Sequence, residues 1–186
     1  MKFKRLVKKI CIIFAKILGY IAYDRRYLTG RLFEETSSGW LYVLKNIVWQ
    51  KVFRINGNIP FPVSPLSKIY NHENIIFHPD DMNNFQSPGV YFQNFKGKIY
   101  IGRGSYIAPN VGLITSNHDL KNLEKSISGE DIVIGEKCWI GMNSVLLPGT
   151  ILGNNTIVGA GAVVTKSFKE GNCIIGGVPA KKIKEL

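Results

Sequence analysis

The chain has 186 residues, enough for one domain with a hydrophobic core and an additional segment. Hydrophobic residues make up 45% and charged residues 20% of it, which excludes a wholly disordered chain. The net charge of +11 is uneven, because residues 1–56 hold twelve Lys and Arg against three Asp and Glu, a net +9. Such a basic segment can contact nucleic acid, a membrane surface or an acidic ligand.

The cysteines indicate the compartment. Cys11, Cys138 and Cys173 leave an odd one over, and no Cys-x-x-Cys motif occurs. This usage fits a reducing setting better than a secreted disulfide framework. We therefore expect a cytoplasmic protein.

Residues 1–22 have the pattern of a basic amphipathic helix, with apolar residues at three-to-four spacing. The apolar series is Leu6, Ile10, Ile13, Ile17 and Ile21. Lys16 interrupts the apolar run, which argues against a membrane-spanning helix and against a signal peptide. Two other interpretations stay open. The helix packs on the protein's own body or a neighbouring subunit, or it makes a peripheral contact with the inner membrane face through anionic lipid.

A second helix is expected over residues 39–54, with one apolar face made of Trp40, Leu44, Ile47 and Val48. Pro60, Pro62 and Pro65 follow, and alternate prolines favour extended backbone. We therefore divide the chain into a basic, mostly helical segment 1–56, an extended junction with the start of a first coil at 57–88, and a repeat region 89–186.

The repeat region has a period of six. Aliphatic residues recur at every sixth position in two phased series, and a small or apolar residue precedes each by two positions. The first series is Ile101, Ile107 and Leu113, and the second is Ile134, Ile140, Leu146, Leu152, Val158 and Val164. Positions two apart share one face of a strand, and glycine often follows the aliphatic residue, as at Gly102 and Gly135, where we expect it to relieve a corner. The pattern predicts an all-β fold, a parallel β-helix of hexapeptide repeats.

The period of six is interrupted between Leu113 and Ile134. The twenty-one positions that separate them are three and a half hexads, so part of 117–131 must leave the stack as an excursion loop. His118, the only histidine after residue 78, lies at the exit point.

The segment "IGEKCWIGMNSVLLPGTILGNNTIVGAGAVVTKSF", with the later "GGVPAKKI", resembles the hexapeptide-repeat acyltransferases. Within them it is similar to the sugar O-acetyltransferase and xenobiotic acetyltransferase branch, and most of all to capsular-polysaccharide acetyltransferases. The resemblance covers about residues 57–186. It implies left-handed coils, which depart from the usual right-handed crossover, a homotrimer, and acetyl-CoA bound in the groove between neighbouring subunits.

Acetyl transfer to a hydroxyl requires a base, and neutral imidazole can accept the proton. The resemblance assigns that role to His118 in its Asn-His-Asp segment. Asn117 and Asp119 either orient the imidazole or cap the turn. Ser116 offers a covalent alternative, although no nucleophile-elbow motif is present. The resemblance also implies that a backbone N–H from the Gly141 region stabilises the oxyanion.

The resemblance also implies a set of acetyl-CoA contacts along the repeats and the C-terminal tail. These are Trp139, Gly141, Ala160, Thr165, Lys166, Lys181 and Lys182. Each lysine taken alone can equally be a solvated surface charge, and Trp139 can equally be a packing residue. "GAGAVV" at 159–164 is not a dinucleotide fingerprint, because it lacks the third glycine.

Upstream of the coils, Asn84, Gln93 and Asn94 are candidate contacts to the acceptor sugar. The "HPDD" segment at 78–81 is interpreted as a turn, and no metal is expected. A zinc enzyme on this fold would need about three His ligands, and only His118 is available in the coils.

The sequence therefore predicts an acetyl-CoA-dependent O-acetyltransferase that modifies a sugar hydroxyl of a capsular or other surface polysaccharide, or its lipid-linked precursor. An N-acetyltransferase on an amino sugar and a catalytically inert scaffold are the alternatives. Nucleic acid is not expected as a partner, because the basic charge is concentrated in one amphipathic segment and no aromatic-interleaved basic platform appears.

Overall fold

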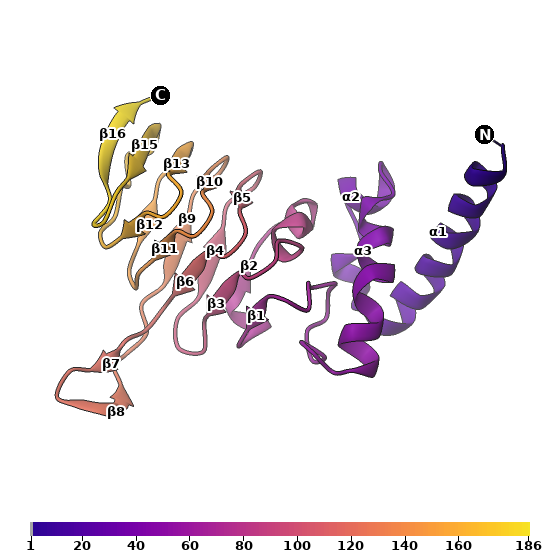
Figure 1. The fold of residues 1–186 in the computed structure, drawn as a ribbon, viewed down its shortest axis with the longest axis horizontal. Coiled ribbons are helices and arrows are strands. Elements are labelled where there is room, and N and C mark those ends of the chain that lie inside the picture. The colour runs from indigo at the N-terminus through magenta and orange to yellow at the C-terminus, as the bar shows by residue number, and fades with distance from the viewer. Residues whose placement is uncertain (1) are drawn as a thin grey trace. The chain divides into compact units, whose positions relative to one another are not determined.

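The computed structural model describes the backbone of residues 2–186 and side chains from residue 4 onward. The chain divides into two units, the first ending at Pro65 and the second running from Leu66 to Leu186 (Figure 1). The division falls inside the predicted junction 57–88.

The first unit is helical. It contains α1 (Lys2–Ala22), the 3-10 turn η1 (Arg25–Tyr27), α2 (Arg31–Glu34), α3 (Ser38–Ile47) and the π-helix η2 (Val48–Val52). α1 confirms the helix predicted at residues 1–22. It packs closely on α3, where a Cβ at Gly19 would lie only 3.2 Å from the Trp40 ring. Within residues 2–186, no helix is long and apolar enough to cross a bilayer.

The second predicted helix exists, but its buried face differs from the expectation. Trp40 is buried as predicted, whereas Val48 is about half exposed, and Val43 with the polar residue Gln50 takes its place inside. The buried residues Gly39, Val43, Asn46 and Gln50 are spaced by four, three and four, so the helical period is kept and the buried face is rotated from the expected one. An apolar pattern misses this face, because Asn46 and Gln50 within it are polar.

Gln50 organises the proline-rich segment that follows. Its side-chain oxygen accepts hydrogen bonds from the Tyr23 hydroxyl at 2.8 Å and from the Val63 N–H at 3.0 Å. Its side-chain nitrogen donates to the carbonyls of Phe61 at 3.1 Å and Asn56 at 3.2 Å. One buried amide thus satisfies backbone groups that have no strand partner.

The second unit is built from three parallel sheets. Sheet 1 contains β1 (Lys68–Ile69), β3 (Tyr91–Gln93), β6 (Gly112–Ile114), β11 (Val145–Leu146) and β14 (Val163–Val164). Sheet 2 contains β2 (Ile75–Ile76), β4 (Ile99–Ile101), β9 (Ile132–Ile134) and β12 (Ile151–Leu152). Sheet 3 contains β5 (Tyr106–Ile107), β10 (Trp139–Ile140), β13 (Thr156–Val158), β15 (Cys173–Gly176) and the antiparallel β16 (Lys181–Glu185).

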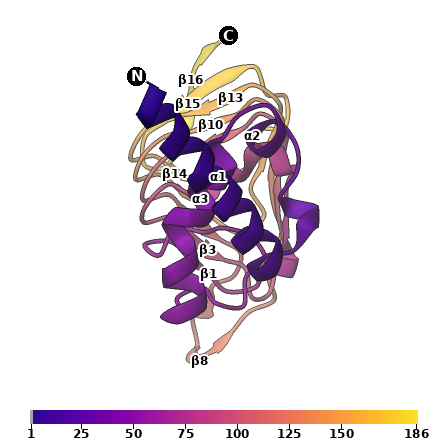
Figure 2. The same ribbon diagram turned by 90° about the vertical axis from the view of Figure 1, so that its right-hand side faces the viewer.

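From β4 to β14 the chain visits sheets 2, 3 and 1 in turn, so each of these coils contributes one strand to each sheet. Two 3-10 segments, η3 (His72–Asn74) and η4 (Pro79–Phe85), accompany the first coils. Figure 2 shows the coils lying behind one another. The predicted parallel β-helix is thereby confirmed as an architecture.

The six-residue register is also confirmed, because all nine aliphatic positions and all nine positions two residues before them are buried. Residues of successive coils are in register within each sheet. Ile101 is opposite Ile134 in sheet 2, and Leu113 is opposite Leu146 in sheet 1. The core is therefore a set of stacked ladders at the strand spacing of about 4.8 Å.

The glycines that follow the aliphatic residues have a different role from the one expected. Gly102 and Gly135 do not adopt positive φ. A Cβ at Gly102 would lie 2.3 Å from the carbonyl carbon of Gly135 in the next coil. The residues with positive φ come two positions later, at Gly104 and Lys137. Close approach of the coils, and not backbone strain, therefore requires glycine at 102 and 135.

Replacing Gly102 by Ala should lower the free energy of unfolding by about 1–3 kcal/mol, because the added methyl overpacks two backbones. Urea unfolding followed by circular dichroism measures the change. Gly112→Ala is the matched control, since its Cβ would make ordinary contacts with side chains alone, the Val145 methyls at 3.5 Å and Ile114 Cδ1 at 3.9 Å. Equal destabilisation by both substitutions would contradict the coil-contact explanation.

Candidate functional site

The segment that breaks the repeat is a β-hairpin arm. β7 (His118–Asp119) and β8 (Asn122–Ser126) pair antiparallel between the coil strands β6 and β9. The arm projects beyond the outline of the stack (Figures 1 and 2). Leu120 and Leu123 on the arm are 95% and 69% exposed. The excess residues that the sequence places in a loop therefore form an ordered projection with an apolar tip.

The base of the arm is fixed by hydrogen bonds. The Glu130 N–H donates to the Thr115 carbonyl at 2.8 Å, and the Ile127 N–H donates to the Asn117 carbonyl at 3.0 Å. The Lys96 ammonium donates to the carbonyls of Ser126 and Ile127 at 2.9 and 3.0 Å. These bonds hold the two strands of the arm where they leave the coil.

The Gln93 side chain bonds to the backbone where the arm leaves the coil. Its side-chain oxygen accepts from the Thr115 and Ser116 N–H groups, both at 3.0 Å, and its side-chain nitrogen donates to the Ser116 carbonyl at 3.0 Å. The amide is thus engaged with the backbone two residues before His118. Gln93 positions the arm, a function that the sequence alone did not suggest.

The His118 imidazole has a defined partner. Its Nδ1 lies 2.7 Å from the Leu123 carbonyl oxygen across the hairpin. A carbonyl can only accept, so Nδ1 carries the proton in the neutral ring and the lone pair is on Nε2. His118 is exposed, which leaves Nε2 available to an incoming hydroxyl.

The neighbours of His118 have other contacts. The Asp119 carboxylate accepts from the Lys121 N–H at 2.8 Å, as in the turn-capping alternative. Ser116 is buried, and its hydroxyl has no hydrogen-bond partner within residues 2–186. A buried hydroxyl is not presented to a donor at the surface, so the geometry does not favour a Ser116 acyl-enzyme.

An apolar groove of about 240 Å³ lies along the corner between sheets 3 and 1. It brings together Trp139, Gly141 and Ala160, three of the residues expected to contact acetyl-CoA. Its other lining residues are Ala108, Met142, Ile157, Val158 and Gly159. Trp139 is more than half exposed, so its ring is a wall of the groove and not part of the coil interior.

The oxyanion donor expected from the Gly141 region is not the Gly141 N–H itself. The Gly141 N–H donates to the Val158 carbonyl at 2.9 Å, so it belongs to the ladder between coils. It cannot also serve an oxyanion in this arrangement. A donor from this region has to be another group.

The remaining residues expected to contact acetyl-CoA lie outside that groove. Thr165 and Lys166 form the corner after β14, where the Lys166 ammonium lies 5.7 Å from the centre of the Phe168 ring. Lys181 and Lys182 are on β16, and Lys182 pairs with Glu185 at 2.5 Å. That exposed pair is screened by solvent and can exchange for a phosphate.

The arm and the groove are on different corners of the coil. The groove follows the corner after sheet 3, whereas the arm leaves the corner after sheet 1, and the strands of sheet 1 lie between them. Thr165 and Lys166 share the corner of the arm. One chain therefore presents His118 and the apolar groove at two separate places.

Two candidate acceptor contacts are internal. The Asn84 side chain is buried, donates to the Ser105 carbonyl at 2.9 Å and accepts from the Ile107 N–H at 2.8 Å. The Asn94 side chain is also buried and bonds to the backbone of Tyr70 and Asn71. Both amides satisfy the first coils, so we leave them out of the proposed acceptor site.

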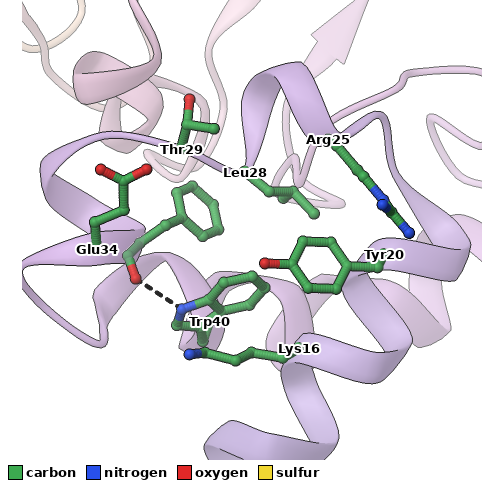
Figure 3. A pocket seen from close by; sticks show the side chains of 8 residues that line it. Lys16, Tyr20, Arg25, Leu28, Thr29, Glu34 and Trp40 are labelled. Atoms are coloured by element: carbon green, nitrogen blue, oxygen red, sulfur yellow. Dashed lines mark hydrogen bonds between the residues drawn. The ribbon is translucent and has the colours of Figure 1, made fainter.

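A second cavity, of about 480 Å³, lies within the helical unit (Figure 3). Its lining includes the cations Lys16 and Arg25, the rings of Tyr20 and Trp40, and the carboxylate of Glu34. It contains no histidine or cysteine. Across residues 2–186, no three His, Cys, Asp or Glu side chains are grouped to hold a metal.

Comparison with known proteins identifies the repeats. Residues 131–166 match the family model described as bacterial transferase hexapeptide (six repeats). The chain is 40% identical over 103 residues to the putative lipopolysaccharide biosynthesis O-acetyl transferase WbbJ of Escherichia coli K12, covering 47% of this chain and 50% of that protein. It is 34% identical over 128 residues to the galactoside O-acetyltransferase of the same strain, covering 56% and 62%.

These matches confirm the resemblance to hexapeptide-repeat O-acetyltransferases that the sequence indicated. The chain spans about half to three fifths of the length of these relatives. A solved galactoside acetyltransferase in complex with coenzyme A is similar in fold, with a TM-score of 0.57, 23% identity, and coverage of 95% of this chain and 81% of that one.

The hydrogen bond to Leu123 predicts the tautomer of His118. At a pH where the ring is neutral, ¹⁵N NMR should show the proton on Nδ1, because the carbonyl can only accept it. A proton on Nε2 of His118 would contradict the arrangement.

Proposed function

We propose that the protein is an acetyl-CoA-dependent O-acetyltransferase acting on a sugar hydroxyl of a capsular or other surface polysaccharide, or of its lipid-linked precursor. The observation that carries the proposal is the His118 ring on the arm, with Nδ1 bonded to the Leu123 carbonyl and Nε2 open. The matched O-acetyltransferases support the same class of reaction.

The reaction proceeds by direct transfer. Nε2 of His118 accepts the proton of the sugar hydroxyl as its oxygen attacks the thioester carbonyl. The tetrahedral intermediate collapses, the carbon–sulfur bond breaks, and the imidazolium returns the proton to the departing CoA thiolate. The Leu123 carbonyl keeps the ring oriented throughout and stabilises the imidazolium, as a fixed acceptor at Nδ1 does.

Acetyl-CoA is the proposed donor. The apolar groove suits the pantetheine chain, with the exposed Trp139 ring as one wall and Gly141 and Ala160 allowing close approach of a ligand. Thr165, Lys166, Lys181 and Lys182 are the proposed contacts near the nucleotide end, where lysines act as point charges for phosphates.

A homotrimer with left-handed coils completes the proposed site. The arm and the groove occupy different corners of one chain, so His118 of one copy meets the groove of the next in a closed ring. The exposed Leu120 and Leu123 supply apolar surface for that contact. The enzyme is placed in the cytoplasm, with a peripheral contact to the inner membrane face through residues 1–22.

His118→Ala should lower turnover by about 10²–10⁴-fold while leaving the affinity for CoA unchanged, because general-base help is lost and the groove is intact. Thiol release from acetyl-CoA, measured across a panel of nucleotide sugars and oligosaccharides, tests both the activity and the acceptor.

His78→Ala is the matched histidine control, since His78 lies between β2 and η4 on the corner after sheet 2, whereas the arm leaves the corner after sheet 1. Unchanged turnover in His118→Ala would end the assignment of the base. Product formation on amino sugars alone would establish the N-acetyltransferase instead, and no thiol release with any acceptor would support an inert scaffold.

Trp139→Ala should raise the Kd of CoA about tenfold, because it removes an aromatic wall from the groove. Isothermal titration with CoA measures the change. Trp49→Ala, which truncates a comparably exposed tryptophan of the helical unit, is the control. Equal affinity in Trp139→Ala and wild type would place CoA elsewhere.

A further inference from the structure

One side of α1 carries a row of apolar side chains that the described part of the chain leaves uncovered. The row consists of Leu6, Val7, Ile10, Ile13, Phe14, Ile17, Tyr20 and Ile21, which are 42–80% exposed. At 3.6 residues per turn they fall within a sector of about 140°. The helix packs on α3 through its other side, where Ala15 and Gly19 are buried.

The apolar surface continues onto a second element. A groove of about 340 Å³ has an almost wholly apolar lining that joins the end of α1 to η2. Ile21 of the row and Val48 and Val52 of η2 all line it. We call the row together with Val48 and Val52 the docking surface. It is larger than the scattered single apolar residues of an ordinary protein surface.

Positive charge borders this surface. Residues 2–22 contain six Lys and Arg and no Asp or Glu. At 100° per residue, Lys9 and Lys16 follow one edge of the row and Lys4 lies beyond the other. An apolar stripe between basic edges is the arrangement of helices that lie in the plane of a membrane interface.

The helical cavity adds two fixed cations beside one edge of the row. The Lys16 ammonium lies 5.6 Å from the centre of the Trp40 ring, and the Arg25 guanidinium lies 5.1 Å from that of Tyr20 (Figure 3). Tyr20 belongs to both the cavity and the row, so the cavity opens at the border of the docking surface. The phosphate of a lipid headgroup is a fitting partner for these cations.

We propose that the protein docks on an anionic lipid bilayer through this surface, with α1 lying in the interface plane and Lys16 and Arg25 facing headgroup phosphates. A second copy of the chain is a poorer occupant, because apposing two such helices would bring together two segments of net charge +6. The inference rests on the membrane location in the proposed function and sharpens it. It does not involve any residue of the proposed acetyl-transfer site.

The full chain should sediment with vesicles of equal phosphatidylglycerol and phosphatidylcholine. The bound fraction should fall at least tenfold on pure phosphatidylcholine or in 0.5 M salt, because charge attraction is lost. Ile17→Glu and Val52→Glu, one from each element, should each weaken binding at least tenfold. Lys9→Gln with Lys16→Gln should weaken it about tenfold at low salt only.

Leu66→Glu is the matched control, because Leu66 is 70% exposed but lies in the coil unit. It should change binding less than twofold, and circular dichroism checks the folding of each variant. No sedimentation of the wild type with anionic vesicles, or equal binding by the wild type and both glutamate variants, would overturn the proposal. The proposal would also be overturned if Ile17→Glu changed the subunit number, measured by light scattering, while the wild type did not bind vesicles.

The vesicle assay and the turnover assay separate the two proposals. Ile17→Glu should acetylate a soluble acceptor at the wild-type rate while failing to bind vesicles. If the protein binds vesicles but shows no His118-dependent turnover, the proposed acetyltransferase activity is rejected and the proposed docking surface is retained.

Discussion

The contact between successive coils is the constraint on which the second unit depends. Backbones at the corners approach so closely that a single methyl at Gly102 would overlap the next coil. The inward ladders, such as Leu113 on Leu146, hold their register only while each turn keeps the same number of residues. Extra residues cannot be absorbed inside the stack and must leave it. The arm that carries His118 is the direct outcome of that rule.

The repeats were predictable because a period of six is visible in any sequence that buries the same side of every turn. Ile101 and Ile134 could be assigned inward from spacing alone, and they are buried. The side-chain hydrogen bonds were not predictable, because they depend on which groups meet across the fold. Gln93 was expected from the sequence to contact the acceptor sugar, yet its side chain bonds to the backbone of residues 115 and 116.

The same limit applies to the site and the helices. The sequence named His118, but its partner at Nδ1 is a main-chain carbonyl, which has no signature of its own. Two asparagines chosen for their polarity prove to be internal struts, since an amide can serve a sugar or a backbone equally well. In α3 and η2 the buried face includes the polar residues Asn46 and Gln50, so an apolar pattern placed Val48 inside although it is exposed.

The final strand of the coil unit has a consequence for solubility. A parallel stack has an open last rung whose unpaired groups would accept another strand, and growth could continue from chain to chain. β16 covers β15 in the opposite direction and places Lys181, Lys182, Lys184 and Glu185 along the edge. Its reversed direction and its charges terminate the ladder. The strand thus protects the protein from the fibre formation to which its own architecture is prone.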